Sequence, residues 1–99
     1  MTSNIKLGDI VTLNRDFMDN PAGTKGYVYE EYDIGHPGVS VITEDGTNLG
    51  GFSEDEFQFL TFERSSGYYY RFKNAIQLDW DFGELIAPLF KEQEASANL

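Results

Sequence analysis

Few side chains in this 99-residue chain combine the types and the spacing that catalysis or metal binding requires. His36 is the single histidine, and it lies between Gly35 and Pro37 in a stretch rich in turn formers. It would need a neighbour such as Asp33 to act as a base or a metal ligand, and a turn histidine is the simpler interpretation. Because the chain has no cysteine, a zinc site or a nucleophile–histidine pair would depend on His36 alone.

The other candidates for chemistry are carboxylates. Asp79 and Asp81 are two positions apart and would share one face of a strand, where a catalytic pair needs a pocket and one raised pKa. Glu54, Asp55 and Glu56 are consecutive, so their side chains diverge, and the D-x-D-x-D-G spacing of a calcium loop is absent. We therefore predict a protein that is not an enzyme, with no catalytic residue, no metal and no cofactor.

The charge of the chain is strongly negative and unevenly distributed. The net charge is −10, from 17 acidic and 7 basic residues. Residues 44–63 contain no base and hold the acids Glu44, Asp45, Glu54, Asp55, Glu56 and Glu63. Such a field repels phosphate backbones, which argues against general nucleic-acid binding. It would instead steer the chain toward a basic protein surface, although a charge of this size also serves solubility.

A second candidate surface is the run Tyr68–Tyr70, which is followed by Arg71 and Lys73. Aromatic rings with cationic neighbours can form a stacking platform for single-stranded nucleic acid. Exposed tyrosine and arginine are also favoured at protein interfaces, whereas rings on the inner face of a strand would belong to the core. Our candidate partner-binding residues are Glu44, Asp45, Glu54, Asp55, Glu56, Tyr69 and Arg71.

The elements that must position these residues are short strands separated by glycine turns. This spacing predicts a mainly β fold, a small antiparallel barrel that is only partly closed. The expected strands cover residues 9–14, 24–33, 39–44 and 47–52. Phe57, Phe59 and Phe62 would anchor a fifth strand. Phe17 and Met18 lie in the polar loop after the first strand, and we expect both to fold back on the barrel.

Turn and cap signals separate these strands. Asp45–Gly46 indicates a two-residue hairpin in which both central residues have positive φ. Ser53 and Glu56 have the spacing of a capping box, which predicts one helical or 3₁₀ turn. Gly26 predicts a bend or a close backbone approach in the second strand, and Gly50–Gly51 predicts a fourth strand that is short, bulged or at an edge.

The last third of the chain allows more than one interpretation. Tyr68–Phe72 is typical of a strand, and the alternation in Ala75–Trp80 would fit another. A helix-like stripe then consists of Leu85, Ile86, Leu89 and Phe90. Since Pro88 lies inside this stripe, either a short helix begins near Ala87 or a longer helix kinks.

Composition sets the size and class of the protein. With 40% hydrophobic and 15% aromatic residues, the chain can form one domain, residues 1–99, with a modest core. We expect the barrel over about 6–63, C-terminal strands and a short helix over about 64–93, and a frayed tail over 94–99. No apolar run approaches the ~20 residues of a membrane span, and no secretory signal is evident. A cytoplasmic location is the expectation.

Three glycine-punctuated stretches carry a family resemblance: Leu7–Val11, Ala22–Val28 and Gly38–Val41. Together they resemble the small SH3-like barrels of the KOW and translation-protein type. The stretch Gly51–Glu56 also resembles that of short uncharacterised bacterial proteins. The resemblance implies an SH3-like barrel, and KOW-like modules often contact RNA or ribosomal partners through basic loops. The corresponding loops here carry Lys6, Arg15 and Lys25 among many acids.

Two functions follow as hypotheses. The first is a non-catalytic acidic module that docks on a protein partner with a basic surface, as an inhibitor or an immunity-type protein would. The alternative is a nucleic-acid- or ribosome-associated SH3-like module that uses Tyr68–Lys73. No membrane partner is expected. A homo-oligomer would form by pairing at the edge of the fourth strand or of Tyr68–Phe72.

Overall fold

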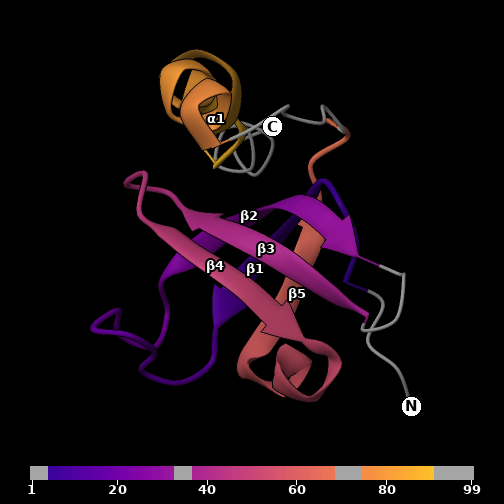
Figure 1. Ribbon diagram of the computed structural model, residues 1–99. Helices are drawn as coiled ribbons and strands as arrows, with labels where there is room; N and C mark the ends of the chain where they lie inside the picture. The colour runs from indigo at the N-terminus through magenta and orange to yellow at the C-terminus, as the bar shows by residue number, and fades with distance from the viewer. Residues whose placement is uncertain (1–4, 33–36, 69–74, 91–99) are drawn as a thin grey trace, which may run out of the picture.

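The computed structural model of the chain describes residues 5–32, 37–68 and 75–90 (Figure 1). Five antiparallel strands form one sheet in the order β4-β3-β2-β1-β5. The strands are β1 Asp9–Leu13, β2 Lys25–Tyr32, β3 Gly38–Thr43, β4 Asn48–Ser53 and β5 Leu60–Ser65. Because β4 and β5 do not pair with each other, the sheet is not closed. The predicted mainly β fold is confirmed, and an unclosed sheet of this kind is consistent with a partly open small barrel.

A 3₁₀ helix, η1 Glu54–Phe59, joins the two edge strands. The edges of a flat five-stranded sheet would lie about 19 Å apart, whereas six residues of 3₁₀ helix span only about 12 Å. The sheet must therefore curve to bring β4 and β5 within reach. The predicted capping box is present, because the Ser53 amide donates to Glu56 Oε1 at 2.9 Å. The helix is longer than the single turn that we expected.

Residues on one face of the sheet form an inner core. Val11 and Leu13 lie on this face, as two residues two positions apart in a strand should. The buried members are Ile5, Val11, Leu13, Val28, Val39, Val41, Leu49, Phe52 and Leu60. Gly26 in β2 makes the close approach that its type predicted, since a Cβ there would lie 2.5 Å from Val41 Cγ1. The inner core is therefore packed so closely at Gly26 that a larger residue would not fit there without a shift of Val41.

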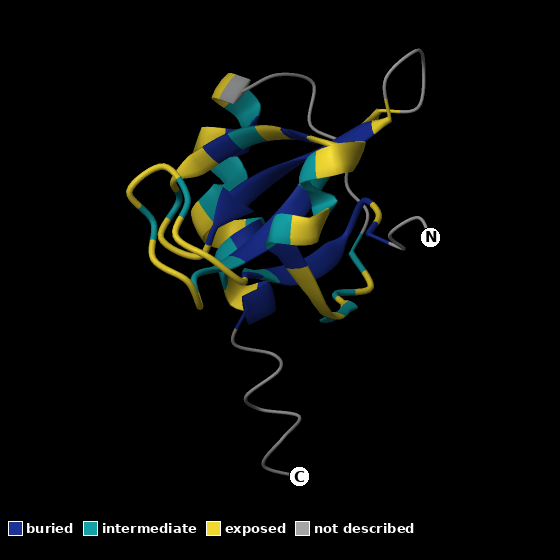
Figure 2. Ribbon diagram, turned by 90° about the horizontal axis from the view of Figure 1, so that it is seen from below, coloured by how far each residue is buried: buried dark blue, intermediate teal, exposed yellow. Residues whose placement is uncertain are grey.

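The opposite face of the sheet is also apolar and forms an outer core with the C-terminal helix. Successive residues of a strand point to opposite faces, so Ile10 and Tyr27 lie opposite Val11 and Val28. The buried members are Ile10, Tyr27, Ile42, Leu78, Ile86, Leu89 and Phe90. Buried positions accordingly run along the strands, and exposed positions gather on loops and helix surfaces (Figure 2).

The C-terminal helix begins with α1, Ala75–Asp81, and continues through a π-helical turn, η2, Phe82–Ile86. Helical backbone then extends over residues 87–90. In η2 the Ala87 amide donates to the Phe82 carbonyl, five residues earlier. A proline ring in a regular helix clashes with the carbonyl four residues before it, and the wider turn before Pro88 relieves that clash. A helix interrupted near Pro88 is therefore correct, and a helix that begins near Ala87 is not.

Two strands were predicted in this region, and the structure describes only one of the two segments in full. A strand over Ala75–Trp80 is wrong, because Leu78 and Ile86 are buried on one face of the helix while Ile76 and Trp80 lie on the other. The decisive term is burial of that helical stripe against the sheet, which outweighs the β propensity of a short alternating run. Most of the expected strand Tyr68–Phe72 lies outside the described residues.

Three local predictions about the barrel also differ from the structure. Gly46 has a positive φ of 92°, but Asp45 does not, so the β3–β4 connection is a turn closed by glycine rather than a two-residue hairpin. Phe62 is 51% exposed on β5 and lies outside the inner core, whereas Phe57 and Phe59 pack on the inner core from η1. Met18 is 66% exposed and does not fold back on the barrel as Phe17 does.

Candidate functional site

The predicted acidic site is divided between the two ends of β4. Glu44 and Asp45 precede this strand, and Glu54–Glu56 follow it in η1. Six residues of strand span about 20 Å. Figure 1 shows this separation, with the β3–β4 turn near α1 and η1 at the far end of the sheet. The structure thus forms two acidic surfaces instead of one continuous site.

The first surface joins the β3–β4 turn to the C-terminal helix. Glu44 and Asp45 are both exposed. The turn contacts the helix at the next residue, since a Cβ at Gly46 would lie 3.6 Å from Phe82 Cε2. Asp79 is exposed and precedes Phe82 by three positions, so it lies on the neighbouring strip of the helix. Two segments that are distant in the sequence, each with exposed acidic residues, therefore lie next to each other at this end of the molecule.

Asp45 also helps to hold the turn that presents it. Hydrogen bonds from the Thr43 hydroxyl, first, and from Thr47 lower the pKa of Asp45 below its ordinary value of 3.8. A depressed pKa means that the unfolded state binds the proton more tightly, so this contribution to stability is present above 3.8 and is lost as the pH falls through the lowered value. Asp45 is therefore charged at neutral pH.

The exposed face of the C-terminal helix carries an apolar pair that the sequence patterns did not single out. Ile76 is 67% exposed and Trp80 is 83% exposed, and they are four positions apart, so they are neighbours on the helix surface. Asp79, Gly83 and Glu84 are exposed on the same face. The signal was the i, i+4 spacing of Ile76 and Trp80, which becomes informative only once residues 75–80 are taken as helical.

The expected pairing of Asp79 with Asp81 is wrong. In a helix, side chains two positions apart do not face each other. Asp79 is exposed, whereas Asp81 is half-buried at the end of α1. Two carboxylates that diverge in this way do not form an acid–base pair. Asp79 belongs instead to the exposed face that carries Trp80.

The second acidic surface lies on η1. Glu54 and Asp55 are exposed, while Glu56 accepts from the amide and the hydroxyl of Ser53 and so holds the start of the 3₁₀ helix. The loop before β2 packs beside this helix, with the Arg15 guanidinium 4.6 Å from the centre of the Phe59 ring. Of the three predicted acids here, Glu54 and Asp55 are therefore the two whose exposed carboxylates are available to a partner, as far as the described residues show.

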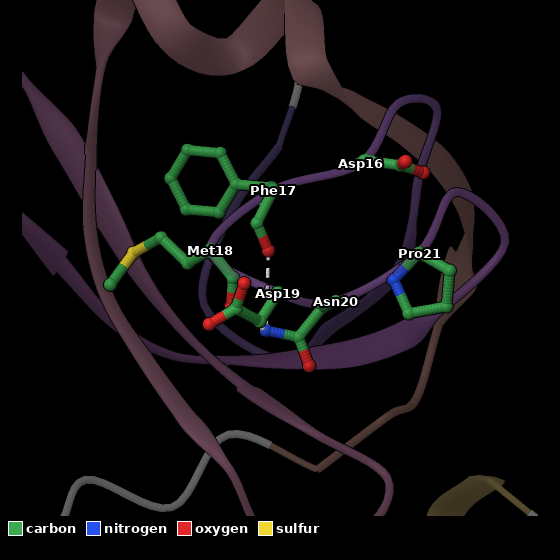
Figure 3. Close-up of a pocket in the computed structure, with 6 residues that line it drawn as sticks. All are labelled: Asp16, Phe17, Met18, Asp19, Asn20 and Pro21. Carbon is green, nitrogen blue, oxygen red and sulfur yellow. Dashed lines mark hydrogen bonds between the residues drawn. The ribbon is translucent and has the colours of Figure 1, made fainter.

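The loop beside η1 contains a tight turn around a hollow of 320 Å³ (Figure 3). Phe17 and Asn20 exchange two backbone hydrogen bonds of 2.7 and 2.8 Å. Most residues around the hollow are exposed, so it does not shield a ligand from water. Met18 and Asp19, the central residues of the turn, have φ values of 47° and 66°. Positive φ at both positions defines a type I′ turn, which favours Asn-Gly.

The double substitution Met18→Asn with Asp19→Gly is expected to raise the free energy of unfolding by about 1 kcal/mol, because both native residues are in the left-handed region. Urea denaturation measures this gain. As a control, Ala22→Gly in the same loop should lower stability by about 0.5 kcal/mol, through the entropy of glycine in the unfolded chain. A double variant less stable than the wild type would contradict the assigned turn.

The remaining candidates from the sequence lie partly beyond the structure. Tyr69, Arg71, Asp33 and His36 are outside the described residues. Tyr68 is half-buried, and its carbonyl accepts a hydrogen bond of 2.7 Å from the Tyr27 hydroxyl. This tyrosine packs against the outer core, so its ring is part of the fold.

A buried carboxylate at the start of β1 was not predicted. Asp9 is 6% exposed, and its Oδ2 accepts from the Lys6 amide at 2.7 Å. Glu31 Oε1 accepts from the Leu7 amide at 3.0 Å, so two carboxylates hold one turn. Burial raises the pKa of Asp9, partly offset by the hydrogen bond and charge of Lys6, and Glu31 raises it further. Since both groups bind backbone amides, the arrangement is structural.

The raised pKa of Asp9 predicts how the stability of the fold depends on pH. The native state binds the proton more tightly than the unfolded state, so the contribution of Asp9 to stability falls as the pH rises from 3.8 through the raised value. The free energy of unfolding of Asp9→Asn should therefore exceed that of the wild type by most at pH 7, and this difference should shrink toward pH 3.8. Urea denaturation across this range tests it. A pH-independent difference between the two proteins would contradict the assignment.

In residues 5–32, 37–68 and 75–90, no three histidine or carboxylate side chains gather as a metal site would require. Within the same ranges no helix has the length and apolar character to cross a membrane. No protein-family model, curated protein or solved structure matches the chain.

Proposed function

We propose that this protein is a non-catalytic acidic module that docks on a basic surface of a protein partner, in the manner of an inhibitor or immunity-type protein. The observation that carries the proposal is the imbalance of exposed charge. On the described surface, the exposed basic side chains are those of Lys6 and Arg15. The exposed acids there are Asp16, Asp19, Glu30, Glu31, Glu44, Asp45, Glu54, Asp55, Glu63, Asp79 and Glu84.

This imbalance favours a protein partner over a nucleic acid. An acidic surface attracts lysine and arginine side chains and accelerates their approach at low salt, whereas it repels phosphates. The alternative, an SH3-like module associated with nucleic acid or the ribosome, would use Tyr68–Lys73. Its strongest support is the family resemblance of residues 7–46. A cytoplasmic location belongs to the same proposal.

Affinity capture at two salt concentrations tests the proposal. The tagged protein should retain a basic protein from lysate at low ionic strength and release it at about 0.5 M salt, where the Debye length is only a few ångströms. Nuclease treatment of the lysate should leave the capture unchanged. Capture that resists salt, or that disappears after nuclease treatment, would overturn the proposal and favour the alternative in the second case.

A further inference from the structure

We infer that the exposed helix face formed by Ile76, Asp79, Trp80 and Glu84, together with the adjoining turn residues Glu44–Asp45, binds a basic amphipathic segment of a protein. Apolar side chains of that segment would cover Ile76 and Trp80, and its lysines and arginines would meet the flanking carboxylates. We call these residues the helix-face site. The inference rests on the proposed function and names the surface that performs it.

The helix is already held on the barrel without this face. Leu78 is 1% exposed and Ile86 is fully buried in the outer core, whereas Trp80 is 83% exposed. An Arg64 Nη2 donor on β5 also bonds the Leu89 carbonyl near the end of the helix. The fold thus leaves a tryptophan and an isoleucine side by side in water on an anchored helix. Large side chains presented on a rigid element are the ones that dominate binding energy at protein interfaces.

The charge around the apolar pair identifies the partner. Residues 75–90 contain Asp79, Asp81 and Glu84 and no basic residue. The β3–β4 turn, which carries the exposed acids Glu44 and Asp45, contacts the flank of the helix where Gly46 meets Phe82. A second copy of the chain would bring the same acids against one another, with a net charge of −10 on each molecule. An anionic membrane surface is repelled in the same way, so a cationic polypeptide is the complementary occupant.

Trp80 is the single tryptophan, so its fluorescence reports on the helix-face site directly. The probe is a short synthetic amphipathic peptide of leucine and lysine. It should shift the emission of Trp80 to the blue and protect it from acrylamide, and added salt should weaken the effect. A leucine–glutamate peptide of the same pattern, and a lysine–serine peptide of the same charge, should each leave the emission unchanged.

Two variants separate this site from charge attraction in general. Ile76→Ala retains the fluorescent reporter and should weaken binding of the leucine–lysine peptide about tenfold. Met18→Ala is the matched control, because Met18 is 66% exposed at the other end of the molecule, and it should bind as the wild type does. Circular dichroism establishes that both variants are folded.

Three outcomes would overturn the inference. The first is peptide binding that leaves Trp80 emission unchanged and is lost in Glu54→Gln with Asp55→Asn, since docking would then occur at η1. The second is equal weakening by Ile76→Ala and Met18→Ala. The third is sedimentation that shows a dimer abolished by Trp80→Ala. In the first case the proposed function survives, because an acidic surface still binds a basic polypeptide. A failed salt-dependent capture of any basic protein would remove the proposed function itself.

Discussion

Phe52→Ala is expected to lower the free energy of unfolding by about 3–5 kcal/mol, measured by urea denaturation. Phe52 is 1% exposed in the inner core, and its ring centre lies 4.8 Å from that of Phe17. Truncation would remove transfer free energy and leave a cavity that the curved sheet cannot close. Because a domain of this size has a free energy of unfolding of only about 5–15 kcal/mol, this single substitution would remove a large part of it.

Phe62→Ala is the matched control for this substitution. Phe62 is also an aromatic residue of an edge-strand region, but it is 51% exposed. We expect a loss of about 1 kcal/mol or less. Equal losses at Phe52 and Phe62 would contradict the assignment of the inner core, since the two side chains would then be equally buried.

Leu78→Ala is expected to cost about 2–5 kcal/mol and to increase amide hydrogen exchange over residues 82–90. Leu78 is 1% exposed and contacts the outer core, through which the helix is attached to the sheet. Its loss would loosen the attachment of the whole C-terminal segment. Urea denaturation and hydrogen exchange followed by mass spectrometry measure the two effects.

Ile76→Ala is the control that separates a helix from a strand here. In a strand, Ile76 and Leu78 would lie on the same face and their substitutions would have similar effects. In the helix observed, Ile76 is 67% exposed and lies away from Leu78, so its substitution should cost about 0.5 kcal/mol or less. Comparable losses at the two positions would contradict the helix.

The barrel could be predicted from the sequence because its signals are local. The strand period in β1 places Val11 and Ile10 on opposite faces of the sheet whatever the rest of the chain does, and the two residues belong to the inner and the outer core respectively. The Ser53–Glu56 spacing marks the start of η1 in the same way, since both partners of the capping interaction lie within one turn. Each signal is complete within a few residues of its own element.

The C-terminal helix and the candidate site could not be predicted in this way, because both depend on distant contacts. Leu78 is buried only because Ile10, Tyr27 and Ile42 leave the outer face of the sheet apolar. Similarly, nothing near Glu44 in the sequence indicates that its turn meets Phe82, which is 38 positions further along. The acids that seemed continuous in the chain are separated by strand β4, and the turn that carries Glu44 instead contacts the C-terminal helix at Phe82.

Photo-crosslinking from position 80 tests most directly whether this protein is an acidic module that docks through its helix face. A benzophenone amino acid replaces Trp80 in one variant and Met18 in another, and both are irradiated in cells that make the protein. We expect position 80 to crosslink to a polypeptide and position 18 to give no crosslink. When lysate is irradiated instead of cells, the yield of the crosslink from position 80 should fall as salt is added. Crosslinks of equal yield from both positions, or crosslinks from position 80 to nucleic acid, would contradict the account.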